Sequence, residues 1–173
     1  ERTIKGVTES IFLKGVQTLP VNEQECRQLL EDYDKAINLD QYYAEAYFKR
    51  AIVYLNTLGE TDSAIGDFNR TISLDPKYTE AYYFRGIAYL RLFEYSLAIE
   101  DFNQAITLDP EHVGAYEKRS QSLKVLGVLD PTNESAHNEK AVSDHLKACS
   151  LQEQQIPKAP RTRVEDGIVV TIV

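Results

Sequence analysis

The sequence lacks the features that mark membrane proteins, secreted proteins and disulfide-stabilised proteins. No apolar run approaches the roughly 20 residues that a helix needs to cross a bilayer, and no signal peptide is visible. The two cysteines, Cys26 and Cys149, are isolated and have no metal-ligand spacing. Two buried thiols in a reducing compartment fit this usage better than a disulfide does. We therefore expect an intracellular, cytoplasmic protein that does not insert into membranes.

Methionine is also absent from the 173 residues, and the first residue is Glu1. We therefore expect a fragment, a processed product, or a chain whose modified methionines are not represented. A chain of this length usually forms one domain, and 43% hydrophobic residues are enough to build a core.

Signals for catalysis, metal binding and nucleic-acid binding are missing as well. The net charge of −8 repels nucleic acid, and no basic stripe offsets it. His112, His137 and His145 share no metal-ligand spacing, and Asp144 points away from His145 on a helix. No phosphate-binding glycine loop, nucleophile elbow or zinc-protease helix is present. We expect no enzyme active site, no catalytic residue, no metal and no cofactor, and no nucleic-acid partner.

What the sequence does contain is a tandem repeat. A basic residue recurs at spacings of 36, 35 and 34 residues, as Lys14, Arg50, Arg85 and Arg119. Each is followed within its unit by an aspartate, which gives the series Asp32, Asp67, Asp101 and Asp144. The residue directly after each basic one is small, as Gly15, Ala51, Gly86 and Ser120. A period near 34 residues is typical of helix–turn–helix solenoids, in which each unit stacks on its neighbours.

Each unit has the pattern of two amphipathic helices. Apolar residues recur at offsets of three, four and seven, which predicts helical stripes rather than strands. A small residue at one place on the first helix allows a second helix to approach closely. Pro76 and Pro110 mark the ends of units, because proline cannot continue the preceding helix. We predict an all-α solenoid of four helix–turn–helix repeats, at about residues 8–43, 44–78, 79–112 and 113–151, after a lead of residues 1–7.

This pattern resembles the tetratricopeptide repeat family. That family favours aromatic residues at the fourth and eleventh positions, a small residue at the eighth, alanine at the twentieth and twenty-seventh, and proline at the thirty-second. The matches in the two central units are Tyr47, Tyr82, Tyr54, Tyr89, Ala51, Gly86, Ala64, Ala98, Ala105, Pro76 and Pro110. The outer units depart from it, with Ile11 and Leu29 in the first and about nine extra residues around 130–133 in the fourth. The resemblance implies a right-handed α-solenoid that binds another protein.

The basic residue and the aspartate of one unit lie at positions that face each other across a helical hairpin. We therefore expect four structural ion pairs, Lys14–Asp32, Arg50–Asp67, Arg85–Asp101 and Arg119–Asp144. The alternative is a row of cations that awaits an acidic ligand. Because each unit contains its own aspartate to pair with the basic residue, the structural role is favoured.

In tetratricopeptide arrays the first helices line a concave groove. The resemblance assigns to this groove Phe12, Val16, Phe48, Ile52, Leu55, Asn56, Tyr83, Ile87, Leu90, Arg91 and Gln121. One subfamily clamps the C-terminal carboxylate of heat-shock chaperones with a lysine and an asparagine at positions five and nine of its first unit. Phe12 and Val16 stand there in this chain, so that activity is not expected. The alternative for the apolar members is that they belong to the core between repeats.

The sequence therefore predicts a scaffold or adaptor that binds a peptide or helix of a larger assembly in an apolar groove. One alternative is a targeting or regulatory module of a larger enzyme whose catalytic domain lies outside this chain. Another is a purely structural subunit whose repeats pack into those of a neighbour.

After Leu151 the helical pattern stops. Residues 152–163 are polar and contain two prolines, so we expect a linker. Residues 164–173 end in a β-branched run that favours a strand, although a helical protein offers that strand no partner. We expect an extended apolar tail. It either docks on its own or a neighbouring array, which would cause self-association, or begins a β domain.

Overall fold

The structure is a computed structural model and describes residues 23–129, 131–155, 161–165 and 168–172. The described helices are α2 (Glu23–Leu39), α3 (Ala44–Val53), the short π-helix η1 (Tyr54–Leu58), α4 (Thr61–Leu74), α5 (Thr79–Arg91), α6 (Tyr95–Leu108), α7 (Val113–Leu129) and α8 (Glu134–Gln155). Two strands follow, β1 (Arg161–Glu165) and β2 (Ile168–Ile172).

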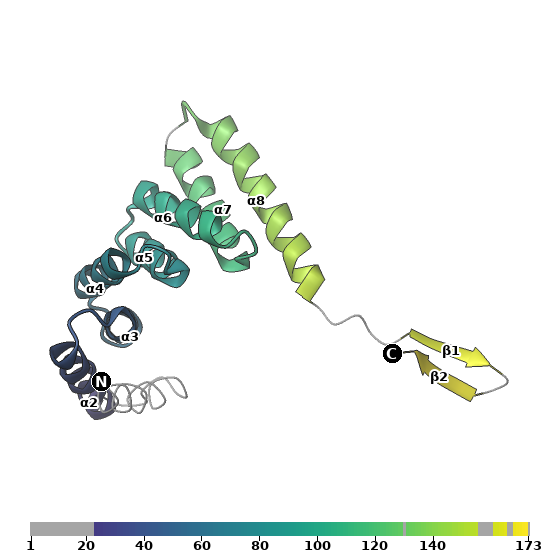
Figure 1. Ribbon diagram of the computed structural model, residues 1–173. Helices are drawn as coiled ribbons and strands as arrows, with labels where there is room; N and C mark the ends of the chain where they lie inside the picture. The colour runs from purple at the N-terminus through teal and green to yellow at the C-terminus, as the bar shows by residue number, and fades with distance from the viewer. Residues whose placement is uncertain (1–22, 130, 156–160, 166–167, 173) are drawn as a thin grey trace.

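The helices form a curved array of antiparallel hairpins (Figure 1). We call the first helix of a repeat its A helix and the second its B helix. The A helices α3 and α5 lie on the inner side of the arc, and the B helices α4 and α6 lie on its outer side (Figure 1). The predicted α-solenoid is therefore confirmed. The A helix expected in the first repeat lies outside the described residues, and α2 is the B helix of that repeat.

Each described B helix before the last ends in the same turn. The side chains of Asp40, Asp75 and Asp109 each accept a hydrogen bond, 2.9 Å long, from the backbone N–H two residues later. This local bond offers the backbone an alternative to further helix. The next A helix begins four residues after the aspartate in all three turns, at Ala44, Thr79 and Val113. The turn therefore fixes where one repeat ends and the next begins.

Small residues allow the two helices of a hairpin to pack closely. A Cβ atom added at Gly86 would lie 2.7 Å from Cε1 of Phe102, whose side chain is fully buried. The equivalent residue Ala51 is fully buried in the core formed with Phe48 and Phe68. In the fourth repeat Ser120 takes this place, and its hydroxyl donates to the backbone oxygen of Ala141 at 2.7 Å.

The C-terminal part differs from the prediction in two respects. The expected linker 152–163 is not one segment, because α8 continues to Gln155 and residues from Arg161 onward form β1. The strand also has a partner, so the expectation of an unpartnered strand was wrong. β1 and β2 pair antiparallel, with Arg161 opposite Ile172 and Val164 opposite Val169. The sequence contained a signal for this hairpin, since Asp166-Gly167 is a pair favoured in two-residue hairpin loops.

Candidate protein-binding groove

Arginine–aspartate pairs connect the two helices of each described hairpin. Arg50 donates to Asp67 from Nε and Nη2, with both bonds 2.7 Å long. Arg119 donates to Asp144 in the same way at 2.7 and 2.6 Å. Arg85 and Asp101 form the third such pair. Two parallel charge-assisted bonds fix both side chains in one orientation. Lys14, expected to pair with Asp32, lies outside the described residues.

Each of these arginines also contacts the preceding repeat. The third guanidinium nitrogen, Nη1, donates a hydrogen bond of 2.6 Å to the preceding repeat. The acceptor is Asp34 for Arg50, Asn69 for Arg85 and Asn103 for Arg119. Each arginine therefore joins its own repeat to the B helix of the repeat before it. The repeat pattern did not predict these acceptors, although Asp34, Asn69 and Asn103 each lie two residues after the aspartate of their repeat.

Tyrosine rings complete the surroundings of these arginines. The guanidinium carbon of Arg85 lies 5.7 Å from the ring centre of Tyr82 and 5.9 Å from that of Tyr89. Arg50 has the same two contacts with Tyr47 and Tyr54. The hydrogen bonds to Asp101 raise the pKa of Arg85, and those to Asp67 raise the pKa of Arg50. Arg50, Arg85 and Arg119 thus all donate hydrogen bonds within the array, so in the described part of the chain they do not form a free row of cations for an acidic ligand.

Two of the predicted groove residues lie in the core. The exposed fraction of Phe48 is 5%, and Leu55 is completely buried. Their assignment to an open groove was therefore wrong. The reason is the neighbouring repeat: the ring of Phe48 lies 4.8 Å from that of Tyr78 and 5.8 Å from that of Phe84, measured between centres.

The other described groove residues reach the surface. Those that are partly buried are Ile52, Tyr83, Ile87 and Leu90, and those that are exposed are Asn56, Arg91 and Gln121. Ile52 and Ile87 pack with part of their surface against the core. Phe12 and Val16 lie outside the described residues. The structure thus places a shorter apolar row on the A helices α3 and α5, with polar residues of α7 at its far end.

Arg91 forms hydrogen bonds with Leu55 and Asn56 of the preceding repeat. Its Nη1 donates to the backbone oxygen of Leu55, and its Nη2 donates to Oδ1 of Asn56 at 3.2 Å. Leu55 and Asn56 belong to η1, where the change from the α-helical hydrogen-bond pattern frees backbone groups. Arg91 therefore satisfies a carbonyl of the second repeat from the A helix of the third.

A histidine contacts the groove between the third and fourth repeats. His112 accepts a hydrogen bond at Nδ1 from the backbone N–H of Ala115 at 3.2 Å, and its Nε2 lies 3.5 Å from Glu80 Oε1. Its ring centre is 4.6 Å from that of Tyr83. The Glu80 carboxylate raises the pKa of His112.

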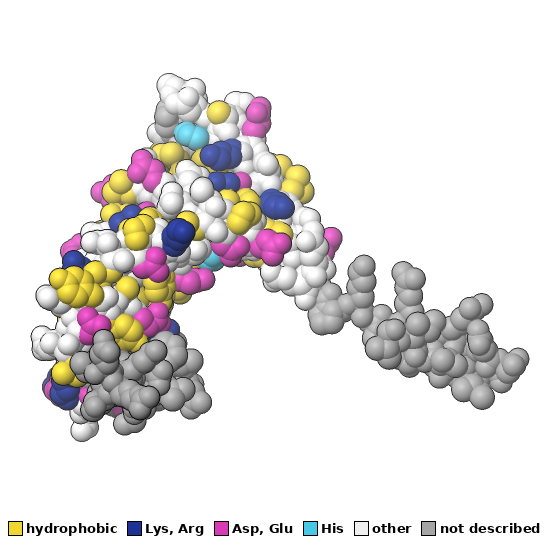
Figure 2. All heavy atoms as spheres, viewed as in Figure 1, with side chains coloured by type: hydrophobic (Ala, Val, Ile, Leu, Met, Phe, Trp, Pro, Cys, Tyr) yellow, Lys and Arg dark blue, Asp and Glu magenta, His cyan; other side chains and the backbone are white. Residues whose placement is uncertain are grey.

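Within the described part of the chain, no group of three or more His, Cys, Asp and Glu side chains could hold a metal ion. No helix in that same part is both long and apolar enough to cross a membrane. Figure 2 shows acidic, basic and apolar side chains interspersed over the visible face rather than one basic patch.

The repeats match a known family. Residues 45–78 and residues 79–112 each match a family model described as tetratricopeptide repeat. These residues are tetratricopeptide repeats. The resemblance predicted from the central units is thereby confirmed. Among curated proteins, none matches the sequence significantly.

Solved structures share the fold of the tetratricopeptide array. A crystal structure of MamA is 25% identical, with a TM-score of 0.65, and the match covers 75% of this chain and 70% of that one. MamA 41-end from Desulfovibrio magneticus RS-1 is 19% identical, with a TM-score of 0.66 and coverage of 86% and 77%. The first TPR of Spaghetti (RPAP3), bound to the HSP90 peptide SRMEEVD, is 23% identical, with a TM-score of 0.59 and coverage of 72% and 90%.

Proposed function

We propose that this chain is a protein-interaction module, a scaffold or adaptor, that holds a peptide or helix of another protein against the A helices of its tetratricopeptide repeats. The observation that carries this proposal is the row of partly exposed apolar side chains on α3 and α5. Ile52 is followed by Ile87 one repeat later, with Tyr83 and Leu90 beside it. Apolar and aromatic side chains on a preformed surface are the usual anchors of protein interfaces.

Polar groups around the row support recognition of a backbone rather than of a single charge. Gln121 and Asn56 are exposed, and Asn56 is held in place by Arg91. Glu80 and Lys49 add one charge of each sign on the same A helices. The carboxylate clamp of the chaperone-binding subfamily is not proposed, because Phe12 and Val16 stand at the positions of its lysine and asparagine. The isolated cysteines support a cytoplasmic setting for this interaction.

A displayed library of random twelve-residue peptides tests this proposal directly. Peptides selected on the wild-type array should contain apolar or aromatic anchors. Their affinity should fall at least tenfold with Ile52→Asp or Ile87→Asp, since removing one anchor of an interface typically costs about 2 kcal/mol.

The matched control is Leu39→Asp, which places the same charge on an exposed leucine of the B helix α2. This variant should bind the selected peptides as the wild type does. Circular dichroism should show that all three variants retain the helical fold. Equal binding to all variants, or a selection that enriches no peptide, would contradict a groove on the A helices.

A further inference from the structure

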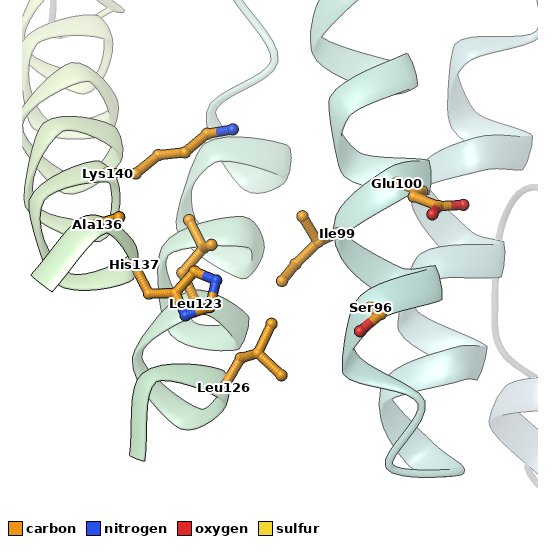
Figure 3. A pocket seen from close by; sticks show the side chains of 8 residues that line it. All are labelled: Ser96, Ile99, Glu100, Leu123, Leu126, Ala136, His137 and Lys140. Atoms are coloured by element: carbon orange, nitrogen blue, oxygen red, sulfur yellow. The ribbon is translucent and has the colours of Figure 1, made fainter. Parts of the chain in front are cut away.

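The B helix of each central repeat packs against the A helix that follows it. Ile65 and Ile72 of α4 pack against a core to which α5 contributes. Figure 3 shows the same arrangement one repeat later, where Ile99 of α6 faces Leu123 and Leu126 of α7. These isoleucines are therefore partly covered by the next helix of the array.

In the described part of the chain, no helix follows α8 to cover the same side of it (Figure 1). Val142 and Cys149 occupy the places of the two isoleucines of α4, and Leu146 lies between them. His145, in the place of the buried Phe68, is exposed. We call these four residues of α8 the α8 face. The exposed fractions of Val142 and Leu146 are 55% and 63%. The last repeat of an array usually has a polar outer side, so apolar side chains there indicate a surface that a partner covers.

Leu146 indicates which kind of helix fits the α8 face. In α4 and α6 the equivalent residues, Asn69 and Asn103, each accept a 2.6 Å hydrogen bond from the arginine of the following A helix. A leucine side chain has no acceptor for such a bond. A helix that packs on α8 as α5 packs on α4 is therefore favoured when an apolar residue replaces that arginine.

Acidic side chains lie at both ends of the α8 face. Glu139 and Glu153 are exposed and lie seven residues before and after Leu146, which places each about 10 Å along the helix and about 20° around it. Lys140 and Lys147 lie about 100–120° around the helix from Leu146. A partner helix with basic residues near both ends therefore matches the face. The α8 helix of a second copy does not, because either orientation would bring two of these carboxylates together.

We propose that the α8 face binds an amphipathic helix of a partner protein, in the way that α4 receives α5. Apolar side chains of this helix pack on Val142 and Leu146, and basic side chains near its two ends pair with Glu139 and Glu153. The face belongs to a B helix, so it is a second binding surface, separate from the groove on the A helices.

The test uses the full chain and two synthetic peptides with the sequence of α5, residues 79–91, and two lysines added at each end. One peptide keeps Arg85 and the other contains Arg85→Leu. The same lactam bridge on the solvent side holds both peptides helical, since a free helix of this length is marginal in water. In an NMR titration at a concentration where the chain is monomeric, backbone resonances of residues 142–149 should shift saturably with the leucine peptide. The arginine peptide should bind about five- to tenfold more weakly, because the α8 face leaves its guanidinium without an acceptor. Leu146→Asn supplies that acceptor and should reverse the preference.

The matched control is Lys147→Asn, which places the same new side chain on an exposed position of α8 outside the face and should keep the wild-type preference. Glu139→Lys combined with Glu153→Lys should weaken the binding of both lysine-capped peptides severalfold. Circular dichroism should show that all variants retain the helical fold. The proposal fails if neither peptide causes saturable shifts, if the shifts occur on the A helices, or if Leu146→Asn leaves the preference unchanged. Shifts of residues 142–149 that depend on protein concentration without peptide would overturn it in favour of a second copy.

Discussion

Arg85 donates two parallel hydrogen bonds to Asp101, from Nε to Oδ2 at 2.8 Å and from Nη2 to Oδ1 at 2.6 Å. The side chains are largely withdrawn from solvent, with exposed fractions of 19% and 6%. A third bond from Arg85 reaches Asn69 in the preceding repeat. One side chain thus stabilises both the hairpin that contains it and the stacking of that hairpin on its neighbour.

The buried pair predicts a coupled loss of stability. Arg85→Ala and Asp101→Ala should each lower the free energy of unfolding by roughly 3–5 kcal/mol, because each change leaves a charge buried without its partner. The double variant should cost less than the sum of the two. Urea unfolding of the four proteins measures this coupling, and strict additivity would mean that the side chains do not interact. Lys35→Ala, which removes ion pairs with Asp32 at 3.4 Å and with Glu31 at 4.0 Å near the surface, should change stability by no more than about 1 kcal/mol.

Contact between repeats predicts a second, smaller effect. Asn69→Ala removes the acceptor that Arg85 finds in the preceding repeat, so we expect a loss of about 0.5–1.5 kcal/mol. Because the bond crosses a repeat boundary, the unfolding transition should also become less cooperative. Leu146 occupies the equivalent place in the last repeat, and its side chain is 63% exposed. Leu146→Ala should therefore leave stability almost unchanged, and an equal loss in both variants would contradict a special role for Asn69.

Close packing predicts opposite effects for two glycines. Gly86→Ala should destabilise the array by about 1–3 kcal/mol, because the new methyl group would lie 2.7 Å from the buried ring of Phe102. Gly66→Ala should stabilise it by about 0.5–1 kcal/mol, because no atom lies within 4 Å and alanine favours helix. Thermal unfolding gives the sign of each change. An increase in stability at both positions would show that the Phe102 ring can move aside without loss of stability.

Structural features that recur within one repeat could be predicted from the sequence, whereas contacts between residues of different repeats could not. The repeat spacing predicted the helical hairpins and located both members of each arginine–aspartate pair, because these features recur within one unit. It did not predict that Phe48 is covered, since the covering residues Tyr78 and Phe84 come from later in the chain.

His112 predicts a pH dependence of stability. Its pKa is raised in the folded chain, chiefly by Glu80, so the folded state binds this proton more tightly than the unfolded state does. The resulting stabilisation is complete below the ordinary value of 6.5 and is lost as the pH rises through the pKa of the folded state. Glu80→Gln should lower the pKa of His112 in an NMR titration and reduce this pH dependence in urea unfolding. An unchanged pKa would show that the carboxylate does not act on the ring.

The C-terminal hairpin predicts self-association. β1 and β2 form a sheet of only two strands, and an isolated hairpin of this kind is at best marginally stable in water. Each strand has one neighbour in this sheet, so each offers an unpaired backbone edge to a second chain. The exposed side chains of Val142 and Leu146 on α8 provide a further apolar surface against which a hairpin can pack.

We therefore expect a dimer to form as the protein concentration rises, visible as an increase in sedimentation coefficient. Deleting residues 161–173 should abolish that increase. Replacing Ile168–Ile172 with glycine and serine at constant length should do the same, because it removes the β-forming sequence without shortening the chain. Self-association that survives both changes would place the contact elsewhere in the array, and in that case Val142→Ser with Leu146→Ser should remove it. A wild-type chain that stays monomeric at every concentration would rule out the hairpin as a contact between copies.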